Sequence, residues 1–553
     1  MESIDKRTLG LQIGFALELF KTGKYEESLI QYEYIINNYE FNFPEIFIAY
    51  GNCLFALGKL DEAIDSFKKA LRINVKLTDA SLGLGKAYLH KKEYQKAEKV
   101  FSNLVENESS LSAANYLAYT YEKQERYNEA EYLYVTILEI NNKLHEVWNG
   151  LALFYKNCRK NEEKAIEAHQ KAIELDTNIN YLRNFALTLL HFDRAKEAIE
   201  ILKKCLDLDL SNSETYNHLA VAYQKTFQKK LGLENFEKSI ELNPENHSAI
   251  FNYAIALLSY EDYKKGFELY TKRWDNPEFT DKKRDFSNEK IYKGKKIKDK
   301  TLLVYSEQGF GDMIQFIRFL PLLKTQSEAK LIFQCEDNLK KLLASSSSVD
   351  KIISMNQNID FDFHIALMDS VNVLNLDEKN IPNKPYIEFV KNEICLQKND
   401  NIKVGLTWRG KKSHDDDHNR SIDLQLFKNL FELEQIDFYS LQVDEKSLEE
   451  IKNYEKLNDT SSLIKDFNDT ANIINQLDLV ISVDTAIAHL SAGMGKKTWI
   501  LLPYFSDWRW GIKREDSLWY SSAKLFRQND DKNWEVVIKK VIESLKNEVG
   551  VKS

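Results

Sequence analysis

The first half of the chain repeats one arrangement of small and large side chains about every 34 residues. In each repeat a small residue is followed four positions later by a larger one, as at Ala97 and Phe101. The small positions are Ser28, Ala63, Ala97, Ala130, Ala165, Ala198, Gly232 and Gly266. Positions i and i+4 share one face of a helix, and two helices cross closely where a small side chain meets a large one. The pattern predicts eight helical hairpins over about residues 9–279.

Hairpins of this length and spacing are typical of tetratricopeptide (TPR) repeats, which stack into an α-solenoid with a long concave face. Two departures occur: the proline that often ends such a repeat is found only as Pro244, and the loop at 160–163 holds an extra residue or two. We expect the concave face to bind a peptide or a partner protein. A purely structural role, as an oligomerisation arm or a support, is the alternative.

The array is followed by a polar, lysine-rich stretch at 275–300 without a sustained apolar period. We therefore assign residues 1–279 to the TPR array and 280–300 to a linker. Trp274, at the end of the last repeat, is expected to pack against the domain that follows.

Beyond residue 300 the pattern changes to short apolar runs that alternate with helical stretches, which predicts a parallel α/β fold. The predicted strands are 301–306, 330–334, 361–365, 402–408, 437–442, 477–483, 498–502 and 524–527. Helices are predicted at 466–476 and 534–546; another follows Asp312 and runs through Leu323, and a fourth begins at Glu445.

Two of the predicted strand-to-helix turns carry candidate chemistry. Asp484 and Thr485 follow a buried strand and open a helix that ends at Gly493 and Gly495. The free backbone N–H groups of such a helix point out of the carboxyl edge of the sheet, where a phosphate can bind. The alternative is that Asp484 and Thr485 only cap the helix.

The other turn contains Glu307, Gly309, Gly311 and Asp312. Its two glycines match neither a dinucleotide fingerprint nor a P-loop. Asp312 is either the helix N-cap or a general base, since a carboxylate in a partly desolvated cleft can take a proton from an attacking hydroxyl. Glu307 is the second candidate for that role.

The loop after the strand at 402–408 is the most charged in the chain. Arg409, Lys411, Lys412 and Arg420 can meet a diphosphate directly. Alternatively, Asp415 and Asp417, flanked by His414 and His418, could hold a divalent metal. We favour direct contact by the cations.

Three phrases of this half resemble the heptosyltransferase-like enzymes of glycosyltransferase family 9. They are Glu307 to Asp312; Trp408 and Arg409 with Arg420 and Ser421; and Asp484-Thr485-Ala486 with Ala488-His489-Leu490, Gly493 and Gly495. The resemblance implies a GT-B fold of two Rossmann-like lobes, at 301–400 and 401–553. It also implies that the last helix crosses back onto the first lobe.

The same resemblance implies that Asp484, Thr485 and His489 hold the diphosphate and ribose of a nucleotide sugar, and that Asp312 acts as general base. The basic loop of the family works without a metal, so no metal and no cofactor is expected. Trp508 either stacks on a base or sugar ring or packs in the core.

Taken together, these features predict a TPR-fused, inverting glycosyltransferase. By architectural analogy with O-linked N-acetylglucosamine transferases, the repeats suggest a protein acceptor, and a cell-envelope glycan is the other acceptor considered. The rival hypothesis is a non-catalytic TPR adaptor with a degenerate transferase-like domain.

The composition bears on the cellular compartment of the protein and on the classes of partner that it can bind. The net charge of −9 argues against nucleic acid as a partner. The five cysteines have no metal-ligand spacing and fit a reducing compartment. Neither a signal peptide nor an apolar run long enough to cross a membrane is apparent, so a cytoplasmic location is expected.

Overall fold

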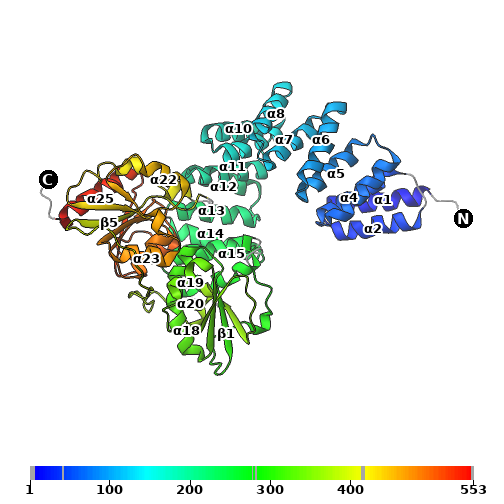
Figure 1. Cartoon of the computed structure of the whole chain (residues 1–553). Helices are drawn as coiled ribbons and strands as arrows, with labels where there is room; N and C mark the ends of the chain where they lie inside the picture. The colour runs from blue at the N-terminus through cyan, green and yellow to red at the C-terminus, as the bar shows by residue number, and fades with distance from the viewer. Residues whose placement is uncertain (1–5, 40–42, 277, 280–282, 413–416, 550–553) are drawn as a thin grey trace. The chain divides into compact units, whose positions relative to one another are not determined.

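The computed structural model describes residues 6–39, 43–276, 278–279, 283–412 and 417–549. The chain forms two compact units, Met1–Thr226 and Phe227–Ser553, and each is described here by itself (Figure 1). The boundary lies in the turn between α13 and α14, inside the predicted TPR array.

The first unit consists of helices that pack pairwise along the chain. They are α1 (Lys6–Lys21), α2 (Tyr25–Asn38), α3 (Pro44–Ala56), α4 (Leu60–Ile73), α5 (Thr78–His90), α6 (Tyr94–Glu108), α7 (Leu111–Lys123), α8 (Tyr127–Ile140), α9 (His145–Phe154), α10 (Glu162–Leu175), α11 (Ile179–His191), α12 (Ala195–Leu208) and α13 (Ser213–Lys225). The extra residue near 160 is accommodated by a π-helical turn, Tyr155–Arg159, that extends α9.

Small residues allow the hairpins to approach closely, as the sequence pattern predicts. The ring of Phe67 on α4 is fully buried between Gly51 of α3 and Gly83 of α5. A methyl group added to Gly83 would lie 2.5 Å from Phe67 Cε1. The small-to-large contacts therefore join neighbouring hairpins as well as the two helices of one hairpin.

The second unit begins with the last three helices of the array, α14 (Lys229–Leu242), α15 (His247–Ser259) and α16 (Tyr263–Tyr270). Tyr263 and Phe267 of α16 pack against Trp508 and Trp519 from the end of the chain. Trp274 donates from its indole nitrogen to Asp369 Oδ2 (3.5 Å), so the expected contact with the following domain is confirmed. The end of the array is thus part of the core of the α/β region.

The first lobe is a parallel sheet in the order β3-β2-β1-β4. Its strands are β1 (Thr301–Tyr305), β2 (Lys330–Cys335), β3 (Lys351–Ser354) and β4 (Phe363–Ala366). Its helices are α17 (Phe310–Phe316), α18 (Leu320–Ser327), α19 (Asp337–Leu343) and α20 (Ser370–Val373). The sequence pattern did not reveal the short strand β3.

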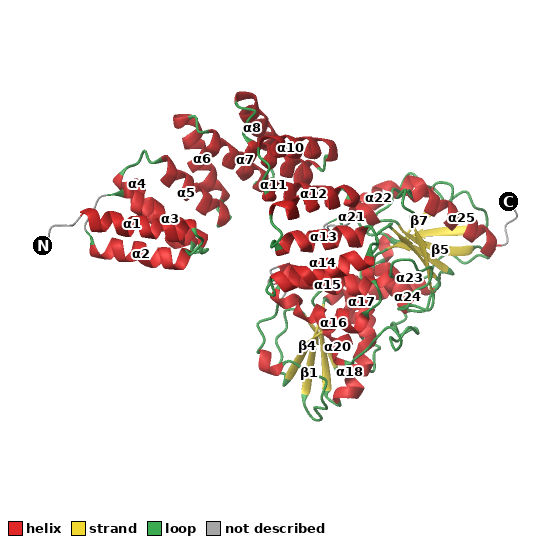
Figure 2. Ribbon diagram, turned by 180° about the vertical axis from the view of Figure 1, so that it is seen from behind, coloured by secondary structure: helices red, strands yellow, loops and turns green. Residues whose placement is uncertain are grey.

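The second lobe is a parallel sheet in the order β10-β9-β8-β5-β6-β7. Figure 2 shows this sheet with β5 and β7 labelled. Its strands are β5 (Ile402–Thr407), β6 (Ile436–Ser440), β7 (Leu457–Asp459), β8 (Leu479–Val483), β9 (Thr498–Leu502) and β10 (Ala523–Arg527). Its helices are α21 (Asp417–Arg420), α22 (Glu445–Ile451), α23 (Phe467–Asn475), α24 (Ala486–Gly493) and α25 (Trp534–Val549).

The last helix does not cross back onto the first lobe, and that expectation is wrong. Val537 and Val541 of α25 are buried against Trp499 and Phe526 of the second sheet. The apolar face of α25 is therefore satisfied within its own lobe.

An extended segment connects the two lobes and is held by amide side chains of α23 and of its C-cap residue, Gln476. Asn468 accepts a hydrogen bond from Val390 N (2.8 Å), and Asn472 accepts one from Asn392 N (3.0 Å). Gln476 does the same for Leu396 N (2.9 Å). Because these side chains satisfy the backbone of the segment, it runs along the second lobe without being a strand.

Candidate functional site

Both sheets place their candidate residues where the strand order reverses. In the second sheet the chain runs outward from β5 in one direction and from β8 in the other, so the reversal lies between β5 and β8. In the first sheet it lies between β1 and β4. The carboxyl ends of the strands beside such a point form the usual ligand crevice of open α/β sheets. Asp484 and Thr485 follow β8, and Glu307 to Asp312 follow β1.

The N-terminus of α24 lacks a side-chain cap. Thr485 occupies the N-cap position, but its hydroxyl contacts Ser482 Oγ (3.0 Å) and no backbone N–H group of the helix. The capping alternative for Thr485 is therefore wrong. The first N–H groups of α24 keep their partial positive charge for a ligand.

Arg420 lies at this helix terminus. Its Nη1 atom donates to the backbone oxygen of Asp484 (3.1 Å), which joins the basic loop to the start of α24. Gly410 leaves room for the Arg420 guanidinium, since a methyl group there would lie 2.5 Å from Arg420 Nη2 and the end of the arginine side chain would have to shift. Ser421 accepts from Gly410 N (3.0 Å) and donates to Asp417 Oδ1 (2.9 Å), which folds the loop back on itself. The structure thus brings together Arg420, Ser421, Asp484 and Thr485.

Trp408 and Arg409 are directed elsewhere. The Trp408 indole donates to Glu450 Oε2 (3.0 Å), and Arg409 Nη2 donates to both oxygens of the same carboxylate (2.6 and 2.8 Å). Glu450 lies on α22, so Arg409 holds that helix and its charge is neutralised there. Lys411 and Lys412 are exposed. His414 and Asp415, two of the four residues of the metal alternative, lie outside the described residues.

Asp484 and His489 form a largely buried pair below the helix terminus. His489 Nε2 lies 3.7 Å from Asp484 Oδ1, and His489 Nδ1 shares a hydrogen bond with the Tyr520 hydroxyl (2.8 Å). Burial, reinforced by the positive charge of Arg509, lowers the pKa of His489 well below its usual value. Burial and the nearby Asp507 carboxylate raise the pKa of Asp484 to about 6. The neutral ring of His489 is only 4% exposed. It therefore contacts the Asp484 carboxyl group from the interior of the lobe and not from the solvent side.

Asp312 lies at the third position of α17 and not at its N-cap, which is Gly309. Its Oδ2 accepts the backbone N–H of Gly309 (3.0 Å), and its Oδ1 is paired with Arg509 of the second lobe. Arg509 also donates to Gln315 Oε1 (2.6 Å) and Asp507 Oδ1 (2.7 Å). Asp312 therefore faces the second lobe.

Close approach of the two lobes depends on Gly311. A methyl group at this position would lie 3.0 Å from His489 Cδ2 and 3.9 Å from the Cα atom of Ala486. The turn that carries Asp312 therefore lies directly against the first turn of α24. A larger side chain at Gly311 would push apart the two segments predicted to form the site.

Glu307 is buried and belongs to a structural network. It pairs with Arg273 (2.6 Å), which also pairs with Asp369 (2.5 Å) after β4. Burial raises the pKa of Glu307 to about 8; the nearby Asp369 carboxylate adds to this rise, and the positive charge of Arg273 opposes it. Glu307 fixes the end of the TPR array to the first lobe.

Trp508 is a packing residue. It is buried with its ring against Tyr263, Phe267 and Trp519 at centroid distances of 5.5 to 6.3 Å. Of its two proposed roles, stacking on a ligand and packing, the structure supports packing.

The sequence supports Arg509 only as a weaker ligand candidate, and it does not single out Gln315, Arg273 or Asp369. Arg509 follows Asp507 in the loop after β9, at the same carboxyl edge as Asp484. This position at the ligand-binding edge is the sequence feature that could have indicated a role for Arg509. Its partner on α17 is 197 residues away, and no local pattern could reveal it.

Matches to models of known families fall in the first part of the chain. Four models described as tetratricopeptide repeat match residues 13–74, 54–118, 110–146 and 213–246. The N-terminal region contains TPR repeats. This agrees with the period found in the sequence and with the helical hairpins of the structure.

Curated relatives share low identity with the chain. Anaphase-promoting complex subunit 3 of Schizosaccharomyces pombe is 27% identical over 41% of this chain and 35% of its own length. Protein O-mannosyl-transferase TMTC3 of Homo sapiens is 25% identical over 34% of this chain and 23% of its own length. The chain thus spans about a third or less of these two relatives. Protein FlbA of Caulobacter vibrioides is 22% identical over 88% of this chain and 93% of its own length, so its similarity covers both the repeats and the α/β region.

The described part of the chain offers neither a membrane span nor a clustered metal site. None of the described helices is long and apolar enough to cross a membrane. Among the same residues, no group of three or more His, Cys, Asp or Glu side chains is placed to hold a metal ion.

Proposed function

We propose that the chain is a glycosyltransferase of the GT-B type that transfers a sugar from a nucleoside-diphosphate sugar to an acceptor hydroxyl. The observation that carries this proposal is the contact between the two reversal points. Gly311 and Asp312 of the first lobe lie against the uncapped start of α24, where Arg420 is anchored. A base and an anion site on opposite lobes are what such a transfer needs.

The donor diphosphate would bind at the N-terminus of α24. The N–H groups at the uncapped start of this helix and the Arg420 guanidinium, which donates to the Asp484 carbonyl oxygen, supply positive charge at one helix terminus. Lys411 and Lys412 are exposed on the same loop and can add to it. This charge stabilises the nucleoside diphosphate as the bond to the sugar breaks, without requiring a metal.

Asp312 would act as the general base on the acceptor. The acceptor oxygen forms a bond to the anomeric carbon as its proton passes to the Asp312 carboxylate. The electron pair of the breaking sugar–oxygen bond leaves with the diphosphate, so a direct displacement inverts the anomeric centre. Gly309 N–H and Arg509 each engage one carboxylate oxygen of Asp312 and hold it in place.

The TPR array favours a protein as acceptor. Proteins built from TPR repeats bind protein partners along their concave face. The name of TMTC3 describes transfer of mannose to protein, and that relative matches about a third of this chain. A cell-envelope glycan is the other acceptor, with the repeats binding a protein of an assembly complex.

The test is release of nucleoside diphosphate from a panel of nucleotide sugars by the full chain. Asp312→Asn should lower turnover by about 100-fold or more while donor binding changes little. Glu336→Gln, an exposed carboxylate of the same lobe, is the matched control. Unchanged turnover in Asp312→Asn would remove Asp312 from the mechanism. Mass spectrometry of co-purified proteins then identifies the acceptor, since a hexose or heptose adduct on a protein marks a protein acceptor.

A non-catalytic adaptor is the second candidate, because three of the charges expected in the site are already paired. Arg409 is bound to Glu450, Asp312 is bound to Arg509, and Arg420 Nε lies 3.4 Å from Asp417 Oδ1. In an adaptor these pairs would be permanent. Donor binding without turnover, in the wild type and in Asp312→Asn alike, would favour this function.

A further inference from the structure

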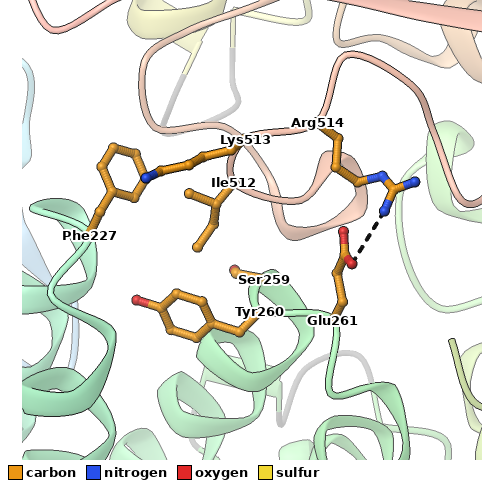
Figure 3. A pocket seen from close by; sticks show the side chains of 7 residues that line it. All are labelled: Phe227, Ser259, Tyr260, Glu261, Ile512, Lys513 and Arg514. Atoms are coloured by element: carbon orange, nitrogen blue, oxygen red, sulfur yellow. Dashed lines mark hydrogen bonds and ion pairs between the residues drawn. The ribbon is translucent and has the colours of Figure 1, made fainter.

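Arg514 and Glu261 lie in the lining of a pocket of about 330 Å³ in the second unit, outside the candidate site (Figure 3). Arg514 is paired with Glu261 (3.5 Å) and with Asp516 (2.7 Å), so these charges are balanced within the protein. A surface whose apolar side chains are left exposed occurs in the first unit. It lies on α1, at the start of the TPR array (Figure 1).

Helix α1 is the first helix of its hairpin, and each later hairpin has an equivalent helix. Ala16 of α1 faces α2, because Ser28 Oγ donates to the Ala16 carbonyl oxygen (2.7 Å). The numbers of these two small residues differ by 12, as do those of Gly51 and Ala63 in the next hairpin. The face of α1 can therefore be compared with the later hairpins position by position.

Phe15, which precedes Ala16, is 56% exposed. The equivalent residues of α5, α7, α9, α11 and α13 are also large and apolar, but they are 3–8% exposed. They are Leu84, Leu117, Leu151, Phe185 and Leu219. Tyr50, the equivalent residue of α3, is partly buried. Phe15 is thus the kind of residue that the array buries at this position, although in α1 it is exposed.

Leu11 shows the same contrast one helical turn earlier. It is 70% exposed, whereas four of its equivalents in later hairpins are at most 3% exposed. These four are Ile46, Ala80, Ala113 and Val147. Leu11 and Phe15 are four residues apart, so they share one face of α1.

In the later hairpins the preceding hairpin covers this face. A methyl group on Gly83 of α5 would lie 2.5 Å from Phe67 of α4, and one on Gly150 of α9 would lie 3.2 Å from Tyr134 of α8. Gly14 is the equivalent residue of α1, and a methyl group there would meet no atom of the described residues within 4 Å. Helix α1 therefore carries the glycine and the large apolar residues of an interface between repeats, and no described helix fills it.

The terminal repeat of a solenoid normally has a polar outer face, which keeps the open end of the stack in water. Leu11 and Phe15 break this rule at the start of the array. A helix that packs on α1 would remove their side chains from water, as the preceding hairpin does for their equivalents. Such a contact would continue the established interface between repeats.

The composition of this face favours a second copy of the chain as the occupant. Leu11, Gly14 and Phe15 lie three and four residues apart, so large and small side chains share the face. Two copies related by a two-fold axis can each place a large side chain against Gly14 of the partner subunit. The face is therefore complementary to itself by the same small-to-large rule that joins the repeats.

The other end of the array decides which contact a second copy can make. Tyr263 and Phe267 of α16, the last helix of the array, pack against Trp508 and Trp519. A head-to-tail stack would need this end to be free, and it is buried in the second unit. A second copy can therefore extend the stack only through its own α1, and that contact closes after two copies.

We propose that two copies of the chain form an end-to-end dimer through α1, with Leu11 and Phe15 of each copy packed on the helix around Gly14 of the other. The two TPR arrays then continue into each other at the interface. This contact does not depend on the proposed transferase activity.

The test is the mass of the full chain in solution, measured by sedimentation equilibrium at increasing concentration. Small interfaces give weak complexes, so the measurement extends to about 100 μM. The wild type should reach the mass of two chains and no more, because a two-fold contact is closed. A mass that stays at one chain, or one that keeps rising with concentration, would overturn the proposal.

Charged substitutions on α1 locate the contact. Phe15→Glu and Leu11→Glu each place a carboxylate on the apolar face and should raise the dissociation constant of the dimer at least tenfold. Tyr132→Glu on α8 is the matched control, since Tyr132 is 74% exposed and lies outside the proposed contact. If Phe15→Glu and Leu11→Glu dimerise as strongly as the wild type, the proposal is wrong.

Gly14→Leu separates the contact from the stability of the helix. Leucine favours a helix more than glycine does, and no described atom within 4 Å opposes a side chain here, so the single chain should not lose stability. The added side chain occupies the space that Leu11 of the partner subunit would fill, and the dissociation constant should rise at least tenfold. A dimer of unchanged affinity in this variant would show that the two helices do not meet at Gly14 and would overturn the arrangement.

Discussion

Arg509, in the loop after β9, forms an ion pair with Asp312 at the start of α17 and so joins the two lobes. The Arg509 side chain is 9% exposed and has two further partners, Gln315 and Asp507. Leaving a buried charge without its partners strongly lowers the stability of the folded protein. This pair is therefore both a link between the lobes and the device that orients the proposed base.

Removal of Arg509 should destabilise the second unit. Arg509→Met leaves Asp312 and Asp507 without their cation, and we expect the free energy of unfolding to fall by about 3 kcal/mol. In a double mutant with Asp312→Asn, the combined loss should be smaller than the sum of the single losses. Urea denaturation measures both effects, and Lys539→Met on the exposed face of α25 is the control. Strictly additive losses would show that the ion pair contributes nothing.

Stability should depend on pH through Glu307. Burial raises the pKa of this carboxyl from its ordinary value of 4.5, which applies to the unfolded chain, to about 8 in the folded protein. Between these values the folded state holds a proton that the unfolded state has lost, so stability falls as pH rises through this window. The Glu307 contribution is fully present below the lower value and is lost above the higher one.

Glu307→Gln tests this dependence, because glutamine resembles the protonated acid and does not titrate. Its urea midpoint should fall less between about pH 5 and about pH 8 than that of the wild type. Glu336→Gln, an exposed carboxylate, should follow the wild type. Parallel profiles for the wild type and Glu307→Gln would contradict the prediction.

The two arginines of the charged loop should differ in their effect on nucleotide binding. If nucleoside diphosphates bind at α24, Arg420→Met should weaken them about tenfold or more, since a charge-assisted hydrogen bond is worth about 1.5–3 kcal/mol. Arg409→Met should leave the affinity for the nucleotide nearly unchanged and lower the stability of the fold, because Arg409 forms an ion pair with Glu450. Thermal shifts with a panel of nucleoside diphosphates provide the measurement. Equal losses of affinity in both variants would show that the loop rearranges on binding.

Glycine substitutions should separate packing from helix propensity in the first unit. Gly83→Ala forces a methyl group against the buried Phe67 ring and should cost about 1–3 kcal/mol. Gly10→Ala on α1 has nothing within 4 Å and should stabilise by up to about 1 kcal/mol. Thermal denaturation followed by circular dichroism compares the two. A loss of stability in both variants would mean that the spacing rule does not explain Gly83.

Local patterns predicted most helices and strands of this chain, because each of them buries an apolar stripe or an apolar run of its own. The eight repeats were visible from positions such as Ala97 and Phe101, and the strands β1, β5, β8 and β9 from their buried runs. The short strand β3 was missed because four residues with one buried side chain carry little periodicity. The partners of Arg409, Asp312 and Glu307 were missed as well, since all of them are distant in sequence.

The sequence by itself determined the repeat period, the alternation of strands and helices, and the carboxyl edges at which Asp312, Asp484 and Thr485 lie. These follow from the spacing of side chains along one segment, which fixes local geometry. Only the tertiary structure decided that Arg509 orients Asp312, that Arg420 and not Arg409 lies at α24, and that α25 covers its own sheet. Such choices depend on which buried charge or apolar face finds a partner, and that is settled only when remote segments pack together.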